Sequence, residues 1–422
     1  MIHMIPNGDT TIVYCCDSMD YYVFPKEKAK ELAEKIDNVE NSSTLSDSRD
    51  ETYEDEFSTL ILNVSNDCNM KCKYCFANHG AYQSPRGMMK ADIACKAVEE
   101  YAYKYHQIKE VKFFGGEPLM NMKTIEAVCR RVYSLHSEGV LNKIPRFKAI
   151  TNGTILNEKV FELIEEYGLN IVFSIDGPPA IHNMTRVFVN GAETFDVLRK
   201  NFEELKKRTQ GAQPCSVEVT YSNAHLVNGM SMADTVEYLY REFNLEPGQV
   251  NVSLVNLNPD DPLALPVGEN CWSDFAKEVI QRKQKGEGFL GDLKLMGFIH
   301  RIKNHKFSSN ILCSAGTSWA AVSSSGKVYP CLMFIDKDEF YMGCVSPAFL
   351  DTDTYRDVSS KFSVCHKLDS PCAKCFAKQI CNRCAGINHF LTGDISGNDP
   401  HQCQIMRDTV EVLIKGIANG II

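Results

Sequence analysis

The sequence predicts an α/β protein built around a parallel β-sheet, and two observations support this fold class. Short apolar, β-branched runs alternate with longer helical patterns between Ser58 and Val255. Strands and helices that alternate at this spacing form parallel sheets with right-handed crossovers, either doubly wound or closed into a barrel. Glycines and polar residues follow nearly every apolar run directly, and the carboxyl ends of parallel strands are where such folds bind ligands.

The alternating part of the chain contains six predicted strands and five helical patterns. The strands are Thr59–Val64, Val111–Phe114, Phe147–Ile150, Ile171–Ile175, Val217–Tyr221 and Val250–Val255. The helical patterns between them are Met88–Tyr105, Met122–Ser137, Glu158–Tyr167, Thr194–Lys207 and Met232–Phe243. Periodicity alone does not decide between a doubly wound sheet and a barrel.

A small separate unit is predicted at residues 1–36. Two extended runs, Thr11–Cys15 and Tyr21–Phe24, precede a helix that begins at Pro25, a favourable first helical position. A strand, strand, helix unit of this size is not stable alone, so it must pack on the rest of the chain. Residues 37–57 are rich in Asp, Glu, Ser and Asn and are predicted to form an acidic linker.

Composition excludes several classes of function. The formal charge is -9, and the sequence contains no stripe of Lys and Arg with interleaved aromatics, so we expect no nucleic-acid partner. No apolar run approaches the roughly 18 residues that span a bilayer, and the N-terminus does not resemble a signal peptide, so we expect a cytoplasmic protein without a membrane partner. Eighteen cysteines in a reducing compartment indicate metal ligation, for which iron-sulfur clusters are the natural use.

Three cysteines follow the first predicted strand in a CxxxCxxC spacing: Cys68, Cys72 and Cys75. A closed structural metal site takes four protein ligands, whereas three thiolates around a four-iron cluster leave one iron open. This spacing, with the aromatic Tyr74 before the third cysteine, resembles the signature of the radical S-adenosylmethionine (SAM) superfamily. A chance grouping, or part of a zinc site completed elsewhere, is the alternative.

The resemblance implies a fold and a chemistry. It implies that residues 58–304 form the partial (β/α)6 TIM-type barrel of radical SAM enzymes. In that family the open iron of a 4Fe-4S cluster chelates the amino and carboxylate groups of the methionine of SAM. An electron from the cluster then cleaves SAM to a 5'-deoxyadenosyl radical.

Two strand-end motifs match the SAM-binding residues of that family. After the second strand comes FFGGEP, and the resemblance implies that Gly115, Gly116 and Glu117 contact the methionine amino group of SAM. After the third strand comes TNGT, where Thr151 and Asn152 are expected to reach a ribose hydroxyl. Simple turns are the local alternative for both motifs.

Further site residues follow the fourth and sixth strands. The resemblance implies that Ser174 lies near the ribose or carboxylate of SAM. It implies that Arg186 pairs with the SAM carboxylate, which suits planar guanidinium geometry, and that Leu254 packs on adenine. Asp176 is expected on the substrate side, as the proton acceptor of sulfatase-maturing members. A turn aspartate, a surface arginine and a core leucine are the alternatives.

A second group of cysteines begins at Cys313. Cys313 and Cys331 lie across a predicted hairpin turned at Ser325 and Gly326, and the later members are Cys372, Cys375, Cys381, Cys384 and Cys403. The pattern resembles the SPASM extension of radical SAM peptide maturases, here residues 305–405, followed by a helix at 406–422. A structural zinc ribbon is the alternative, although its cysteine pairs usually lie farther apart.

The SPASM resemblance implies two auxiliary 4Fe-4S clusters, and thus three clusters in the chain. Cys313, Cys331 and Cys384 would ligate the first auxiliary cluster, and Cys372, Cys375, Cys381 and Cys403 the second. The block CxxCx5CxxC is one residue shorter than the family pattern at its last gap. Cys384 therefore departs from the family spacing, and its role as a ligand is left open by the pattern. The first auxiliary cluster would have three ligands and an iron open to a substrate thiolate, unless Cys344 or Cys365 completes it.

The N-terminal unit resembles an abbreviated peptide-recognition element of thioether-forming maturases, although it is alternatively a simple cap on the barrel. The leading hypothesis is a radical SAM enzyme that forms a thioether between a cysteine sulfur and a carbon of a ribosomally made precursor peptide. Its expected partners are that precursor with its leader sequence and an electron donor such as flavodoxin or ferredoxin. Formylglycine generation in a sulfatase and a non-catalytic iron-sulfur peptide-binding or electron-transfer protein are the alternatives.

Overall fold

A single nine-stranded sheet forms the centre of the molecule. The computed structural model describes residues 1–42, 56–288, 291–306, 313–363, 371–381 and 383–422. The strand order in the sheet is β12-β11-β10-β4-β5-β6-β7-β8-β9. Its parallel strands include β4 (Phe57–Ser65), β5 (Ile108–Gly115), β6 (Arg146–Thr151), β7 (Asn170–Ser174), β8 (Ser216–Tyr221) and β9 (Val250–Leu254).

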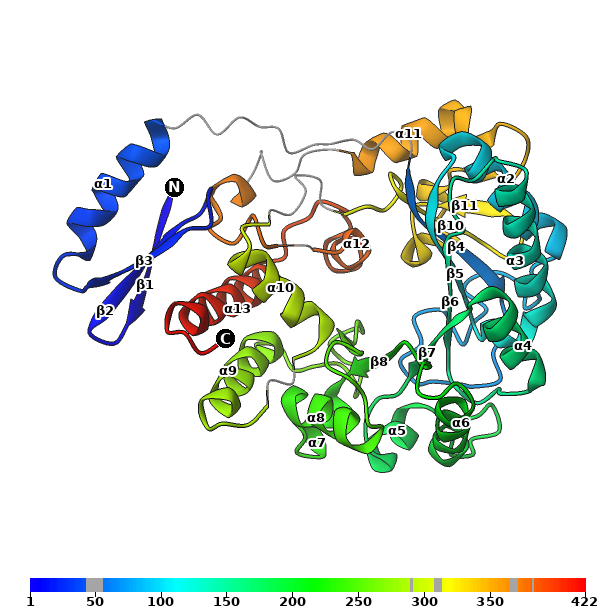
Figure 1. Cartoon of the computed structure of the whole chain (residues 1–422), viewed down its shortest axis with the longest axis horizontal. Coiled ribbons are helices and arrows are strands. Elements are labelled where there is room, and N and C mark those ends of the chain that lie inside the picture. Colours follow the sequence, from blue (N-terminus) through cyan, green and yellow to red (C-terminus); the bar gives the residue numbers. More distant parts are fainter. Residues whose placement is uncertain (43–55, 289–290, 307–312, 364–370, 382) are drawn as a thin grey trace.

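Helices cover one face of this sheet, which curves around the opposite face (Figure 1). They are α2 (Ala91–Tyr105), α3 (Met122–Ser137), α4 (Glu158–Tyr167), α5 (Pro179–Thr185), α6 (Phe195–Arg208), α7 (Asn223–Val227) and α8 (Met232–Glu242). Strands β4 to β9 lie side by side in chain order, whereas a doubly wound sheet reverses its order at a switch point. The structure therefore confirms the predicted partial barrel.

The N-terminal unit contains one more strand than the sequence predicted. The strands β1 (Ile2–Asn7), β2 (Thr10–Cys15) and β3 (Tyr21–Pro25) form an antiparallel sheet, and α1 (Ala29–Ser42) follows. β1 was missed because His3 and Pro6 interrupt its apolar pattern. Pro25 ends β3 rather than starting the helix, and α1 continues into the predicted linker because no Gly or Pro stops it.

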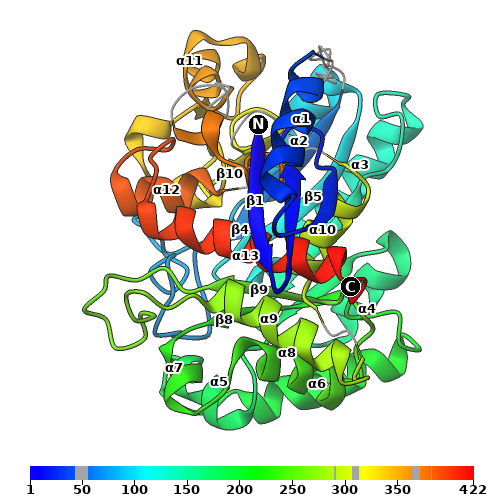
Figure 2. The same cartoon turned by 90° about the vertical axis from the view of Figure 1, so that its left-hand side faces the viewer.

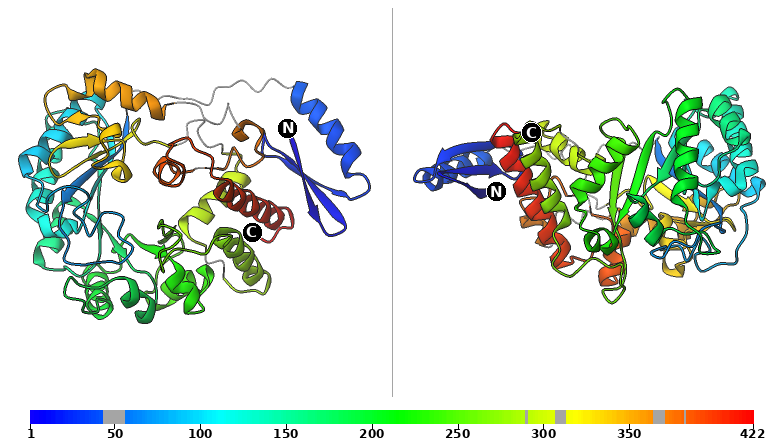
Figure 3. Two further views of the ribbon diagram at one scale, coloured as in Figure 1. Left: turned by 180° about the vertical axis from the view of Figure 1, so that it is seen from behind. Right: turned by 90° about the horizontal axis from the view of Figure 1, so that it is seen from below.

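The C-terminal helices connect the N-terminal unit to the barrel. They are α9 (Cys271–Gln284), α10 (Leu293–Lys303), α11 (Asp353–Phe362), α12 (Ala385–Thr392) and α13 (Pro400–Ala418). α13 crosses behind the N-terminal sheet in Figure 2, and Figure 3 shows that sheet at one end of the molecule. α13 begins at Pro400, capped by Asp399, and therefore starts before the predicted residue 406.

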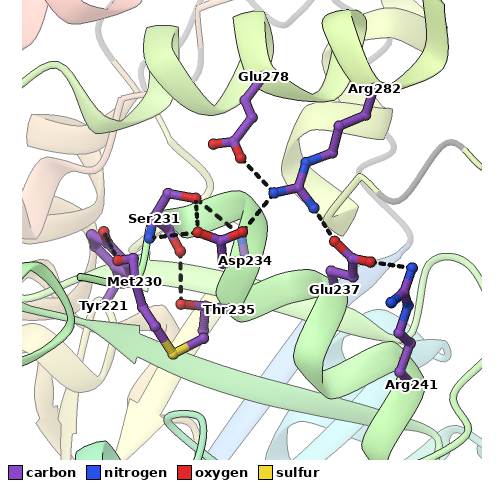
Figure 4. Close-up of polar contacts among 9 residues, drawn as sticks. All are labelled: Tyr221, Met230, Ser231, Asp234, Thr235, Glu237, Arg241, Glu278 and Arg282. Atoms are coloured by element: carbon purple, nitrogen blue, oxygen red, sulfur yellow. Dashed lines mark hydrogen bonds and ion pairs between the residues drawn. The ribbon is translucent and has the colours of Figure 1, made fainter. Parts of the chain in front are cut away.

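Arg282 joins α9 to the last helix of the barrel (Figure 4). Its guanidinium lies 2.6 Å from the carboxylate of Asp234 on α8 and also binds Glu237 of α8 and Glu278 of α9. Ser231 orients Asp234, because its hydroxyl donates to the same carboxylate at 2.8 Å. Arg282 is largely buried, so these pairs are screened less than pairs on the surface.

The hairpin of the second cysteine group extends the barrel sheet. β10 (Trp319–Val322) pairs with β4 in parallel, and β11 (Lys327–Tyr329) and β12 (Gly343–Cys344) follow in antiparallel. The turn contains Gly326 at φ +88°, and the predicted hairpin is confirmed. The sequence did not predict that this hairpin pairs with the barrel sheet. Among the described residues, we find no helix long and apolar enough to cross a bilayer.

Candidate functional site

The predicted SAM-binding residues gather at one edge of the barrel sheet. Cys68 follows β4, Glu117 follows β5, Thr151 ends β6 and Ser174 ends β7. These strands are parallel, so their carboxyl ends meet at the same edge. Leu254 ends β9 at this edge too, and it is half-buried against the core.

The loop with Cys68, Cys72 and Cys75 is fixed by the ends of neighbouring strands. Asn152, after β6, donates from Nδ2 to Asn69 Oδ1 at 2.9 Å and approaches the Cys68 sulfur at 3.7 Å. The thiols lie close enough that Cys72 and Cys75 both raise the pKa of Cys68. Hydrogen bonds from a neighbouring strand therefore hold the first of the three cysteines in place.

Burial makes these thiols poor acids in the absence of a cation. Burial, followed by the charge of Glu117, raises the pKa of Cys68 to about 12. Burial also raises the pKa of Cys72 to about 11, although the charge of Arg186 opposes that shift. A metal deprotonates a coordinating thiol outright, so soft metal binding suits this donor set. Within the described ranges no three His, Cys, Asp or Glu side chains lie at single-ion spacing, so the ligand assignment rests on the resemblance.

The glycines of the GGE motif let β5 approach the cysteine loop. Gly115 has φ +140°, and a Cβ there would collide with the backbone of Ser65. A Cβ on Gly116 would collide with the backbone of Asp67, and one on Gly80 would lie 2.6 Å from the Gly116 Cα. Glycine is thus required by close packing between the second strand end and the loop.

Glu117 is fully buried behind these glycines. Its carboxylate accepts hydrogen bonds from Thr151 Oγ1 and the Asn152 backbone, both at 2.8 Å, and from the Leu119 backbone at 3.0 Å. Burial raises its pKa to about 7, and those hydrogen bonds oppose the rise. The charge state of Glu117 therefore responds to a cation placed beside it near neutral pH.

Asp176 is the centre of a buried polar cluster. Its side chain is fully buried, Tyr74 donates to Oδ2 at 2.5 Å and Arg186 Nε lies 3.1 Å from the same oxygen. Thr185 also donates to Oδ2, and the Thr220 backbone donates to Oδ1. Burial alone would raise the pKa of Asp176, but the Arg186 charge and the other donors lower it.

Two buried histidines complete this cluster. The backbone N–H of Asp176 donates to His182 Nδ1 at 3.3 Å, and His225 Nε2 lies 2.6 Å from the Asp176 carbonyl oxygen, to which it donates. Burial lowers the pKa of both rings, to about 4 for His182. Both are therefore neutral near pH 7, and they hold the backbone of Asp176 through these hydrogen bonds.

The sheet face opposite the helices carries charges that the sequence reading missed. Lys112 of β5 and Lys148 of β6 are register partners, and Glu110 lies 3.6 Å from Lys112 and 3.0 Å from Lys148. Glu218 of β8 lies farther along this face, beside Ser174. The signal was that each of Lys112, Lys148 and Glu218 stands between two apolar residues of its strand, which a strand buried on both faces does not show.

The structure brings together the three cysteines expected to hold the first auxiliary cluster. The thiols of Cys313 and Cys384 both raise the pKa of Cys331, beyond the effect of burial, and the Ala385 backbone N–H hydrogen bonds the Cys313 sulfur. A Cβ on Gly386 would touch Met333 and lie 3.7 Å from the Cys384 sulfur. The shortened gap before Cys384 thus does not remove this cysteine from the group.

Cys344 and Cys365 are the two candidates for a fourth ligand of the first auxiliary cluster. Cys344 is exposed on β12, where it pairs in register with Lys327 at the start of β11. Cys365 lies outside the described residues.

Arg383 links two of the cysteines expected at the second auxiliary cluster. Its Nη1 lies 3.3 Å from the Cys403 sulfur and 2.5 Å from Asn398 Oδ1, and the Cys372 thiol donates to the same Asn398 oxygen at 3.4 Å. Nη2 of Arg383 donates to the Gly397 carbonyl. Cys375 and Cys381 lie between them in chain order, in short turns. The remaining described cysteines predicted as small hydrophobes are buried or half-buried: Cys15, Cys16, Cys95, Cys129, Cys215 and Cys271.

Comparison with known proteins agrees with this geometry. Residues 62–239 match the Radical SAM superfamily. The chain is 28% identical over 222 residues to the radical SAM cyclopropyl synthase TigE of Paramaledivibacter caminithermalis, an alignment that covers 49% of this chain and 43% of TigE. It is 25% identical over 354 residues to a cysteine-type anaerobic sulfatase-maturating enzyme of Clostridium perfringens, covering 78% of this chain and 89% of that enzyme.

Solved structures support the fold over a larger part of the chain. The structure of native anSMEcpe with bound AdoMet and Cp18Cys peptide has a TM-score of 0.67 and 20% sequence identity. The superposition covers 87% of this chain and 99% of that chain. The chain spans less than half the length of TigE.

Proposed function

Residues 62–239 form a radical SAM domain, and on this premise we propose that the protein modifies a ribosomally synthesised precursor peptide. In this proposal a 5'-deoxyadenosyl radical abstracts a hydrogen from the peptide, and a cysteine sulfur joins the resulting carbon as a thioether. The cofactors would be SAM and three 4Fe-4S clusters, one that binds SAM and two auxiliary clusters. The single observation that carries the thioether version is the grouping of Cys313, Cys331 and Cys384.

That grouping offers three thiol ligands where a closed site takes four. Cys344 is exposed and pairs with Lys327 at the edge of the sheet, so we do not assign it as the fourth ligand. An iron without a protein ligand binds a thiolate readily, because metal binding deprotonates the thiol. A cysteine of the precursor is the thiol we propose for this position, and the bound cluster would also accept the electron that the peptide loses.

The SAM cradle follows from the residues at the sheet edge. We assign Glu117 to the methionine ammonium of SAM, because a cation beside a carboxyl with a pKa of about 7 would hold it ionised. Arg186 faces Asp176 through Nε, which leaves its terminal nitrogens available for the SAM carboxylate. Asp176 is then a positioning residue for Arg186 and Tyr74. We assign the ribose hydroxyls to Thr151 and Asn152, the ribose or carboxylate to Ser174, and the adenine to Leu254.

The N-terminal sheet is the proposed site for the leader segment of the precursor. A sheet edge binds an extended peptide by adding it as a strand. We assign the leader to β3, an edge strand whose Val23 is exposed. The sheet is held to α13, because His3 Nε2 lies 2.8 Å from Glu411 Oε1 and the His3 ring stacks on Phe376 at 3.7 Å. A flavodoxin or ferredoxin would supply the electron that starts the reaction.

The test incubates the reconstituted full chain with a candidate precursor, SAM and a reductant. We expect a peptide two hydrogens lighter in which one cysteine thiol no longer reacts with an alkylating reagent. Tandem mass spectrometry would locate the bond between the sulfur and the carbon. An unchanged count of free thiols would rule out the thioether version.

A second candidate is the generation of formylglycine in a sulfatase. The similarity to the sulfatase-maturating enzyme over 78% of this chain favours it. In this case a sulfatase peptide without any leader would lose its cysteine sulfur and gain an aldehyde that reacts with hydrazides. A non-catalytic iron-sulfur protein would instead yield no 5'-deoxyadenosine from SAM under reduction.

A further inference from the structure

Tyr82 lies between the two groups of cysteines and has a hydroxyl without a partner. Its side chain is 5% exposed, and within the described part of the chain its buried hydroxyl makes no hydrogen bond. A buried polar atom without a partner is uncommon in native proteins and marks a ligand, an ion or a redox role. The same residue has φ +52°, a conformation that is strained for a bulky side chain and that concentrates at functional sites.

The surroundings of Tyr82 include one cysteine from each group. Burial raises its pKa most, and the thiol charges of Cys75 and then Cys331 are the next two causes. Tyr82 is part of the buried core, and Cys75 and Cys331 are partly buried side chains that pack against that core. The aromatic ring therefore sits where the SAM-binding loop and the first auxiliary group approach one another.

A separate tether holds this arrangement. The carboxylate of Asp336 accepts hydrogen bonds from the Gln83 backbone at 3.1 Å and from the Ser84 hydroxyl at 2.7 Å. Asp336 lies five residues after Cys331, and Gln83 and Ser84 directly follow Tyr82. The segment that carries Tyr82 is thus fixed to the segment that carries Cys331.

We infer that Tyr82 is the electronic link between the SAM-binding site and the first auxiliary site, with its hydroxyl donating to sulfur at the SAM-binding site. This inference rests on the proposed function. SAM gains one electron when its carbon–sulfur bond breaks, and the peptide loses one hydrogen atom to 5'-deoxyadenosine. The peptide thiol loses a proton to solvent and one electron to the auxiliary site. That electron returns past Tyr82 to the SAM-binding site, so each cross-link consumes one SAM and no external oxidant.

Two variants separate the ring from the hydroxyl. Tyr82→Phe keeps the ring and removes the hydroxyl, and Tyr82→Leu removes both. Tyr101→Phe is the matched control, because Tyr101 is fully buried on α2 and its hydroxyl contacts Tyr355 rather than either cysteine group. All four proteins are reconstituted as full chains with iron and sulfide and are studied without peptide.

Iron content and electron paramagnetic resonance first establish that both sites are loaded. A redox titration then gives the potential of each site. After reduction by one electron per protein, freeze-quenched spectra give the rate at which the electron moves between the sites. Failure of the wild-type chain to load both sites would overturn the proposed function, and this inference with it.

With both sites loaded, the outcomes concern Tyr82 alone. We expect Tyr82→Leu to slow redistribution by about tenfold or more, as for other outer partners of metal sites. We expect Tyr82→Phe to keep the rate but make reduction of the SAM-binding site about tenfold less favourable, ~59 mV for one electron, because a hydrogen bond to sulfur is lost. Tyr101→Phe should match wild type. Wild-type redistribution in Tyr82→Leu, or an unchanged potential in Tyr82→Phe, would overturn the inference.

Discussion

The two cysteine groups are built in opposite ways. Cys68, Cys72 and Cys75 lie within one loop that the strand ends of the barrel hold in place. The second group draws its members from segments between Cys313 and Cys403, which meet through α12, α13 and the side chain of Arg383. The first site is a feature of a folded barrel. The second brings together distant parts of the chain, so its ligands and its fold should depend on one another.

The largest expected effect comes from breaking the first group. Cys72→Ala should abolish formation of 5'-deoxyadenosine from SAM under reducing conditions, because the SAM-binding cluster loses one of three ligands. The barrel core does not include the Cys72 side chain, so the thermal unfolding temperature should stay close to wild type. Chromatography of the nucleoside products and calorimetry measure the two quantities. Undiminished nucleoside production would contradict the assignment of this loop.

The second group should respond with a loss of both iron and structure. Cys384→Ala should lower the iron content by about four atoms per chain, the content of one cluster, and should make residues 313–403 more sensitive to limited proteolysis. Cys344→Ala is the matched control, since Cys344 is exposed and is not assigned to the group. Equal iron loss in both variants would show that Cys344 belongs to the site after all.

A smaller effect is expected from the carboxyl behind the first group. The folded pKa of Glu117 is raised from 4.5 to about 7, so the contribution of Glu117 to the stability of the ligand-free protein should be complete below pH 4.5 and be lost as the pH rises through 7. The shift corresponds to on the order of 3 kcal/mol. SAM, whose ammonium needs the ionised form, should bind more tightly over the same rise.

Glu117→Gln is the variant that checks this titration. It should remove the pH dependence of stability and that of SAM binding. The amide of Gln still offers one carbonyl oxygen to the donors Thr151 and Asn152. Equilibrium dialysis measures the affinity for SAM between pH 6 and 8, and denaturant unfolding measures the free energy of unfolding over the same pH range. A variant that keeps the wild-type pH profile would assign the titration to another group.

The smallest expected effect belongs to the second group again. Arg383→Gln should lower the reduction potential of the proposed second auxiliary cluster, because Nη1 no longer donates to the Cys403 sulfur. Arg383→Lys keeps the charge and loses the fork that also reaches Asn398 and Gly397, so it should recover part of the potential. A redox titration that places both variants at the wild-type potential would contradict this role.

Local pattern predicted the alternating strands and helices of the barrel well, although not the choice of a barrel over a doubly wound sheet. β-branched runs such as Thr59–Val64 and the motifs directly after them depend on residues that are neighbours in the chain. Non-local contacts explain what was missed. The burial of Asp176 depends on Tyr74 and Arg186, and the pairing of β10 with β4 joins segments more than 250 residues apart. No sequence period encodes either contact.

Lys112, Lys148 and Glu218 are an intermediate case. Their alternation with apolar neighbours was present in the sequence, and it indicates a strand with one polar face. A barrel lined by charge has this pattern, whereas a doubly wound sheet does not. The same alternation would therefore have distinguished the two sheets without any appeal to a family.

The pairing of β10 with β4 limits how the protein can be divided. Removal of residues 305–422 would expose the backbone N–H and C=O groups of β4, from Thr59 to Leu62, along an edge that β10 now covers. An exposed apolar edge strand is a template for pairing with other chains. The isolated barrel should thus precipitate or form oligomers when produced alone, so the barrel is not a module that can be transplanted without its C-terminal partner.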